Sequence, residues 1–106
     1  MSQEILDLIQ KEIDSNTISL FTKGTADMPM CGFKELGRPF KTVDILPDPR
    51  IRQILSSVSH WPTVPQVFVG GKFIGGSDIV LEMHQKGELK PLVEEAFKAK
   101  QAAPAR

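Results

Sequence analysis

Residues 66–74 read Gln66-Val67-Phe68-Val69-Gly70-Gly71-Lys72-Phe73-Ile74, and this stretch decides the fold. Two short runs rich in β-branched and aromatic residues flank a Gly-Gly pair, which supplies the positive φ angles that a two-residue turn requires. The stretch therefore predicts a β-hairpin. Upstream, residues 17–22 and 40–46 have the same β-branched and aromatic character and read as two further strands.

Amphipathic helices are expected around these strands. Isoleucines recur at helical spacing within residues 3–14, and Asp48-Pro49 combines an N-cap residue with a proline at the first helical position. A third helix is expected to open at Ser77-Asp78 and to turn Ile79 inward, and a last one starts near Leu89. The order α-β-β-α-β-β-α-α predicts an α/β fold, a mixed sheet with helices on both faces.

Length and composition bound the possible functions. One domain is expected over residues 1–100, and residues 101–106 read as a flexible tail. The 13 basic and 13 acidic residues balance, which argues against nucleic-acid binding because that needs a basic surface. No apolar run approaches the ~20 residues of a membrane span, and the acidic start, residues 1–4, is unlike an Arg-rich targeting segment. His60 and His84 have no partner at metal-ligand spacing, so surface or capping roles are expected.

The only thiol lies in Met28-Pro29-Met30-Cys31-Gly32-Phe33, eight residues after Lys23. A lone cysteine can be a small buried hydrophobe, but a position after a strand and near a cation favours the reactive thiolate. Gly32 allows a ligand to approach closely, and Phe33 offers an apolar wall beside the sulfur. One cysteine excludes an internal disulfide and makes a reducing compartment the default. Cys31 is therefore the first candidate for a functional atom.

Three separated segments are expected to converge on Cys31. Lys23 supplies a cation. Thr63-Val64-Pro65 precedes the hairpin; its X-Pro bond is a candidate for the cis form, and the Val64 backbone could pair with an extended peptide. Gly75-Gly76-Ser77-Asp78 is a Gly-rich turn at a helix N-terminus, an arrangement that binds anions. This combination suits a small anionic thiol peptide.

The sequence resembles the monothiol glutaredoxins of the CGFS type, and the resemblance covers nearly the whole chain. The matching segments are Lys23-Gly24-Thr25, residues 29–33, Arg52, residues 61–66, residues 75–79 and Gly87-Glu88-Leu89. The resemblance implies a thioredoxin-like fold with a four-stranded mixed sheet flanked by helices. The single cysteine and the acidic start lead us to expect a cytoplasmic location, or an organellar matrix or stroma after processing.

The resemblance implies glutathione binding. Lys23 and Arg52 would hold the glycine carboxylate, Thr63 and Val64 the cysteinyl backbone, and Ser77 and Asp78 the γ-glutamyl end. The remaining expected contacts are Gly32, Phe33, Pro65 and Gly76. Two protomers, each with one glutathione, would bridge a 2Fe-2S cluster through Cys31 of each and the two glutathione sulfurs, and would pass it on. The implied partners are BolA-like proteins and iron–sulfur acceptor proteins.

Two alternatives stay open. The chain could be a monothiol thiol–disulfide oxidoreductase that removes glutathione from mixed disulfides through Cys31, with weak activity at most. It could also be a variant inactivated by a change after Phe33.

The segment after Phe33 departs from the family. There the family has Ser and a helix of two to three turns, whereas here Lys34-Glu35-Leu36-Gly37 follows directly, so roughly two turns are lacking. As a helix, residues 31–36 would span only about 9 Å, and a parallel crossover takes ~10–12 residues or more. The expectation is that no normal helix forms and that the helix is truncated or missing. Three explanations of the shortened segment compete. The sequence as written could lack residues that belong to the molecule, the protein could have a true deletion, or the loop could rearrange.

Overall fold

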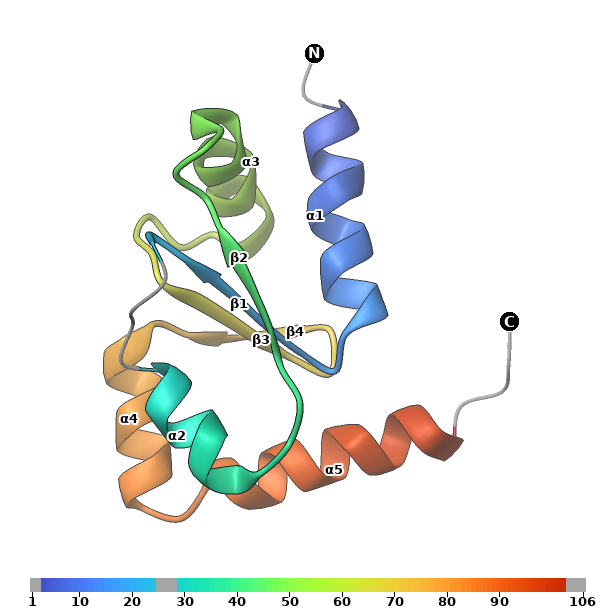
Figure 1. Ribbon diagram of the computed structural model, residues 1–106, viewed down its shortest axis with the longest axis vertical. Helices are drawn as coiled ribbons and strands as arrows, with labels where there is room; N and C mark the ends of the chain where they lie inside the picture. The colour runs from blue at the N-terminus through green and yellow to red at the C-terminus, as the bar shows by residue number, and fades with distance from the viewer. Residues whose placement is uncertain (1–2, 25–28, 103–106) are drawn as a thin grey trace.

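The computed structural model describes residues 3–24 and 29–102. In chain order the elements are α1 (Gln3–Ser15), β1 (Ile18–Thr22), α2 (Pro29–Leu36), β2 (Lys41–Asp44), α3 (Pro49–Ser59), β3 (Gln66–Val69), β4 (Lys72–Gly75), α4 (Ser77–Gln85) and α5 (Leu89–Ala102). The strands form one sheet in the order β2-β1-β3-β4 (Figure 1). β1 is parallel to β2 and antiparallel to β3, and β3 is antiparallel to β4. The mixed sheet is therefore confirmed.

Helices cover both faces of this sheet. α1 and α3 lie on one face, where Ile9 and Leu55 pack around Phe21 of β1. α2, α4 and α5 lie on the other face, where Leu20 of β1 and Val93 of α5 belong to the second core cluster (Figure 1). Because successive strand side chains point to opposite faces, Leu20 and Phe21 enter different clusters. The result is a three-layer α/β fold of the thioredoxin-like type.

The N-termini of α3 and α4 are capped differently. Asp48 caps α3 as predicted: its carboxylate accepts a hydrogen bond from the Arg50 N–H, and Pro49 is the first helical residue. α4 begins at Ser77 as predicted, but neither Ser77 nor Asp78 is its N-cap residue: the N-cap is Gly76, and no side chain among the described residues completes the cap. Ile79 is also not turned inward: it is 37% exposed, whereas Val80 is fully buried. Neighbouring helical residues point about 100° apart, and α4 is oriented so that Val80 of this pair enters the core.

The segment around Cys31 forms a short helix, so the structure decides between the two expected forms, truncated and missing. α2 has eight residues and begins two residues before Cys31. It ends at Leu36, and the next residue, Gly37, has φ 70° and donates its N–H to the Lys34 carbonyl at 3.1 Å. Residues 23–40 together connect β1 to β2, which exceeds the minimum for a parallel crossover because the loops on both sides of the helix contribute. The helix is truncated, not missing.

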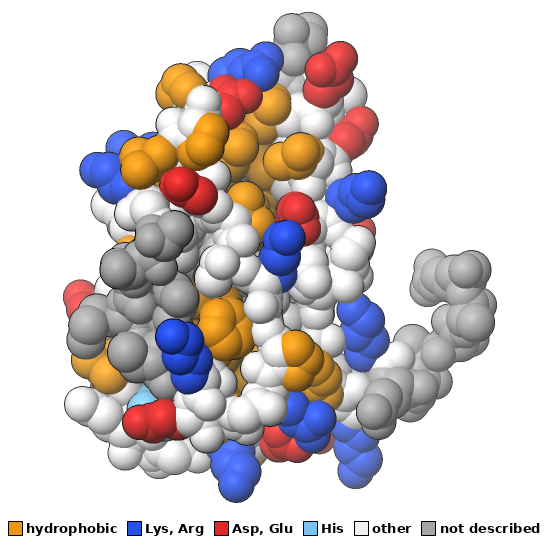
Figure 2. Space-filling model, viewed as in Figure 1, with side chains coloured by type: hydrophobic (Ala, Val, Ile, Leu, Met, Phe, Trp, Pro, Cys, Tyr) orange, Lys and Arg blue, Asp and Glu red, His pale blue; other side chains and the backbone are white. Residues whose placement is uncertain are grey.

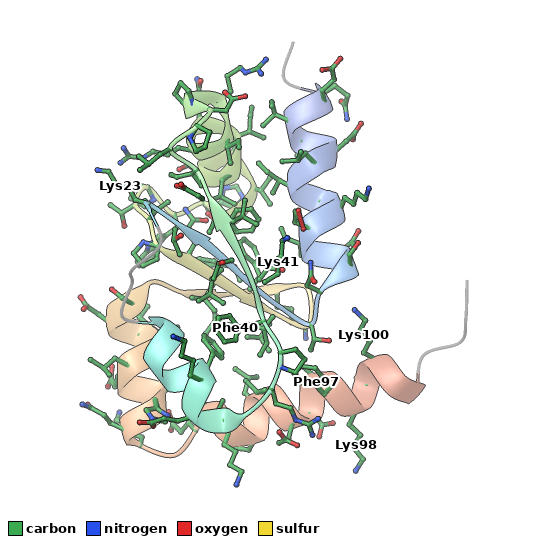
Figure 3. The ribbon with its side chains drawn as sticks, viewed as in Figure 1. Lys23, Phe40, Lys41, Phe97, Lys98 and Lys100 are labelled. Atoms are coloured by element: carbon green, nitrogen blue, oxygen red, sulfur yellow. The ribbon has the colours of Figure 1, made fainter. Side chains whose placement is uncertain are left out.

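Phe33 holds this short helix on the sheet. Its side chain is fully buried in the second core cluster, and its ring centroid lies 6.0 Å from that of Phe40. Leu36 packs against the same cluster. Figure 3 shows Phe40 beside α2, on the chain that leads into β2. These contacts cover core surface that a missing helix would have left open to water.

A hydrogen bond and an ion pair hold the same connection against its neighbours. Glu35 of α2 pairs with His84 of α4. Arg38, just after α2, donates to both carboxylate oxygens of Glu94 in α5, and its guanidinium lies 4.9 Å from the ring centroid of Phe97. This arrangement raises the pKa of Arg38 and lowers that of Glu94, because each charge is hydrogen-bonded to its opposite. The α2–β2 connection is thus tied to both α4 and α5.

The remaining features concern the chain end and the surface. α5 includes Gln101 and Ala102, two residues of the predicted tail, while residues 103–106 lie outside the described residues. Figure 2 shows acidic and basic side chains interspersed over the face in view, without an extended surface of one sign. None of the helices in the described part of the chain is long and apolar enough to cross a membrane.

Candidate functional site

One end of the sheet gathers most of the predicted site residues. β1 ends at Thr22, and β3 begins at Gln66, which lies opposite Phe21. Lys23 therefore leaves the sheet where Pro65 enters it, and Figure 3 shows Lys23 at that end. Gly75, opposite Val67, brings the start of α4 to the same end. The register of the sheet, rather than sequence proximity, brings these segments together.

The chain leaving β1 is held by two polar side chains. The Thr22 hydroxyl donates to the Gly24 carbonyl at 2.6 Å, and the Gly24 N–H donates to the Asp44 carboxylate at 3.0 Å. Asp44 also accepts from the Leu46 N–H at 3.0 Å. Lys23 itself is exposed. The sequence analysis assigned no role to Thr22 or Asp44. The sequence nevertheless shows that a polar residue ends each of the two adjacent strands, β1 and β2, which could have indicated a role in holding the chain after them.

The loop before β3 has the predicted backbone form. The Val64–Pro65 peptide bond is cis. The N–H and C=O of Val64 have no hydrogen-bond partner among residues 3–24 and 29–102. Val64 is half-buried, and Thr63 is exposed. A backbone pair without a partner is what an added extended peptide would bind.

The turn from β4 into α4 packs directly on this loop. A Cβ built on Gly76 would lie 3.3 Å from the Pro65 carbonyl oxygen, which it would crowd, and 3.5 Å from the Trp61 indole nitrogen, an ordinary contact. Ser77 is half-buried and Asp78 is exposed in the first turn of α4. Among the residues that the structure describes, no side chain caps the amides of this turn, which leaves them available to an anion.

Other predicted site residues are placed less fully. Cys31 and Gly32 are the third and fourth residues of α2, but the side chain of Cys31 and the exposure of both residues lie outside what the structure describes. The ring of Phe33 is fully buried and anchors α2, and its position beside the Cys31 sulfur stays a prediction. Arg52 is exposed on α3, which begins beyond the carboxyl end of β2. Whether Arg52 contacts a ligand stays a prediction.

The histidines do not form a metal site in the described residues. His60 ends α3 with φ 60°, a capping role, and His84 pairs with Glu35, so both have the roles that the sequence predicts. Within the described ranges, no three His, Cys, Asp or Glu side chains gather where they could hold a metal ion.

Comparison with known proteins gives a consistent family. Residues 18–74 match the family model described as Glutaredoxin. The chain is 44% identical to the "Uncharacterized monothiol glutaredoxin ycf64-like" of Synechocystis, over 92% of this chain and 98% of that protein. It is 43% identical to "Monothiol glutaredoxin-S14, chloroplastic" of Arabidopsis thaliana, over 92% of this chain and 61% of that protein. The crystal structure of a buckwheat glutaredoxin–glutathione complex is similar, with a TM-score of 0.81 and 31% identity over 90% of this chain and 92% of that one.

The alignment lengths indicate how many positions of the relatives have no counterpart in this chain. The alignment with each of the two relatives is 105 positions long but includes only 92% of this 106-residue chain, which is about 97 residues. About eight aligned positions therefore have no counterpart in this chain. At 3.6 residues per turn, a gap of that size equals roughly two turns of helix. The number of unmatched positions agrees with the roughly two turns by which α2 is expected to be shorter than its family counterpart.

Proposed function

Because the chain belongs to the monothiol glutaredoxin family, we propose that it binds glutathione and carries a 2Fe-2S cluster between proteins. The observation that carries the glutathione site is the unpartnered backbone of Val64, which lies at the sheet end that also bears Lys23 and Gly76. The similar buckwheat structure is a complex with glutathione, which supports the same ligand here.

The tripeptide would lie across this end of the sheet. Its cysteinyl backbone pairs with Thr63 and Val64, and its glycine carboxylate is neutralised by Lys23 and Arg52. The free amides at the start of α4, with Ser77 and Asp78, receive the γ-glutamyl end. Gly32, Pro65 and Gly76 complete the wall, and any contact from Phe33 is limited to its backbone because its ring is buried.

The number of sulfur ligands that one chain can supply determines how a cluster can be held. An all-thiolate 2Fe-2S cluster takes four sulfur ligands, and this chain has one cysteine. A second copy of the chain and two glutathione thiols would therefore supply the other three ligands. Cys31 lies in the first turn of α2, where the free N–H groups and the positive helix end favour the thiolate that ligation requires. BolA-like proteins and iron–sulfur acceptor proteins are the partners we propose, in the cytoplasm or in an organellar matrix or stroma.

A second candidate is removal of glutathione from mixed disulfides, and the lone cysteine in the first turn of α2 favours it. The Cys31 thiolate would attack the glutathione sulfur of a protein–glutathione disulfide and release the protein as its thiolate, which takes up a proton. Free glutathione would then attack the Cys31–glutathione disulfide, which yields glutathione disulfide and restores Cys31. With one cysteine, only this monothiol route is open.

Reconstitution of the pure protein with iron, sulfide and glutathione tests the main proposal. We expect a coloured dimer with cluster absorption, which the Cys31→Ser variant does not form. Lys34→Ala, at an exposed position of the same helix, is the matched control and should load normally. A colourless monomer of the unaltered chain would refute cluster carriage. Turnover of a glutathione mixed disulfide that depends on Cys31 would then favour the second candidate.

A further inference from the structure

A buried amide braces the loop that carries Val64. Gln66, the first residue of β3, is fully buried, and the three residues that follow it in the strand are buried and apolar. Burying an amide costs free energy unless its polar atoms are hydrogen-bonded. The Nε2 of Gln66 donates to the carbonyls of Trp61 and Thr63, at 3.0 Å each. A polar residue at this core position therefore has a specific role in the loop.

The loop has few other restraints. Pro62 and Pro65 lack an N–H group, and residues 61–65 make no backbone–backbone hydrogen bond within the described part of the chain. Apart from the two bonds from Gln66, the loop's hydrogen bonds in that part reduce to one, from the Trp61 N–H to the Ser59 hydroxyl at 3.1 Å. The side chain of Gln66 thus replaces the missing turn hydrogen bonds.

The orientation of the amide supports a donor role. The Oε1 atom of Gln66 is buried and has no partner among the described residues. Exchanging the two ends of the amide would bring Oε1 against two carbonyl oxygens, which is repulsive. The observed orientation leaves one acceptor unsatisfied and keeps both carbonyls bound. One of them belongs to Thr63, whose peptide unit includes the Val64 N–H.

We propose that Gln66 is a positioning residue for the thiol peptide. It fixes the peptide plane between Thr63 and Val64, so that the Val64 backbone meets the cysteinyl backbone of the ligand without a prior ordering step. A loop that must be ordered on binding lowers affinity, because the entropy of ordering is then lost in the binding step. The inference rests on the proposed glutathione site and extends it to a residue that does not touch the ligand.

The test compares glutathione affinity with folding stability in two variants of the same strand. Gln66→Met keeps the length of the side chain and removes both hydrogen bonds. Val67→Ala, also fully buried in β3, destabilises the core without touching the loop. We expect titration calorimetry to give a Kd for glutathione roughly tenfold weaker in Gln66→Met and within about twofold of the unaltered chain in Val67→Ala, although thermal unfolding shows both to be less stable.

Three outcomes would contradict the proposal in different ways. An unchanged Kd in Gln66→Met, or an equal loss in both variants, overturns the positioning role and leaves the glutathione site standing. If the unaltered chain binds no glutathione, the proposed function fails with it. If Gln66→Met does not fold, Gln66→Leu removes the same two hydrogen bonds at this buried position; it should weaken binding by a similar factor, and an unchanged Kd there overturns the proposal.

Discussion

Replacing Phe33 with alanine should cost a large part of the stability of the domain. The side chain is fully buried and packs between α2 and the sheet, beside Phe40. A buried Phe→Ala change costs about 3–5 kcal/mol, from lost transfer free energy and the cavity left behind. Domains of this size have about 5–15 kcal/mol in total. At about 4–8 °C per kcal/mol, the melting temperature should fall by at least about 12 °C.

Urea and thermal unfolding followed by far-ultraviolet circular dichroism would measure this loss. Phe33→Leu should cost less than Phe33→Ala, because it retains most of the buried apolar volume. Lys34→Ala is the matched control, since this neighbour on the same helix is exposed and should change stability by no more than about 0.5 kcal/mol. A loss below about 1 kcal/mol in Phe33→Ala would refute the reasoning. It would show that α2 does not hold to the sheet and would restore the interpretation that this helix is missing.

Three further outcomes are expected. Gly76→Ala introduces a Cβ 3.3 Å from the Pro65 carbonyl oxygen, at a backbone φ of −92° that alanine adopts without strain. Titration calorimetry should therefore show glutathione binding weakened several-fold, while the melting temperature changes little. An unchanged glutathione affinity would contradict the close packing of the site. Arg38 holds the pKa of Glu94 below its ordinary value of 4.5, so the stability from this pair is present above pH 4.5 and is lost as the pH falls through the lowered pKa. Denaturant unfolding between pH 7 and pH 3 should therefore show a shallower acid loss in Glu94→Gln, and identical profiles would exclude the contribution. Asp44→Ala leaves two backbone N–H groups without their acceptor, so the free energy of unfolding measured in urea should fall by about 1–2 kcal/mol. Asp44→Asn retains an acceptor oxygen, and its free energy of unfolding should stay closer to that of the unaltered chain.

Much of the fold could be predicted because its signals are local. The Gly-Gly hairpin, the isoleucine spacing of α1 and the Asp48-Pro49 start of α3 each depend on a few neighbouring residues, and the structure confirms all three. The site could be predicted in outline for the same reason, since its segments carry recognisable motifs. The bonds that hold those segments could not, because Asp44 meets Gly24 across 20 positions of sequence and only the parallel register brings them together.

The sequence by itself determined the order of helices and strands and the presence of a single thiol after the first strand. Only the tertiary structure decided that the helix bearing this thiol forms. Eight residues are too few for a stable helix in isolation, since isolated helices shorter than about 12–15 residues are marginal in water. α2 is held by packing: Phe33 is buried in the core, and Glu35 and Arg38 pair with α4 and α5. These contacts exist only in the folded molecule, so counting the residues after Cys31 could not reveal them.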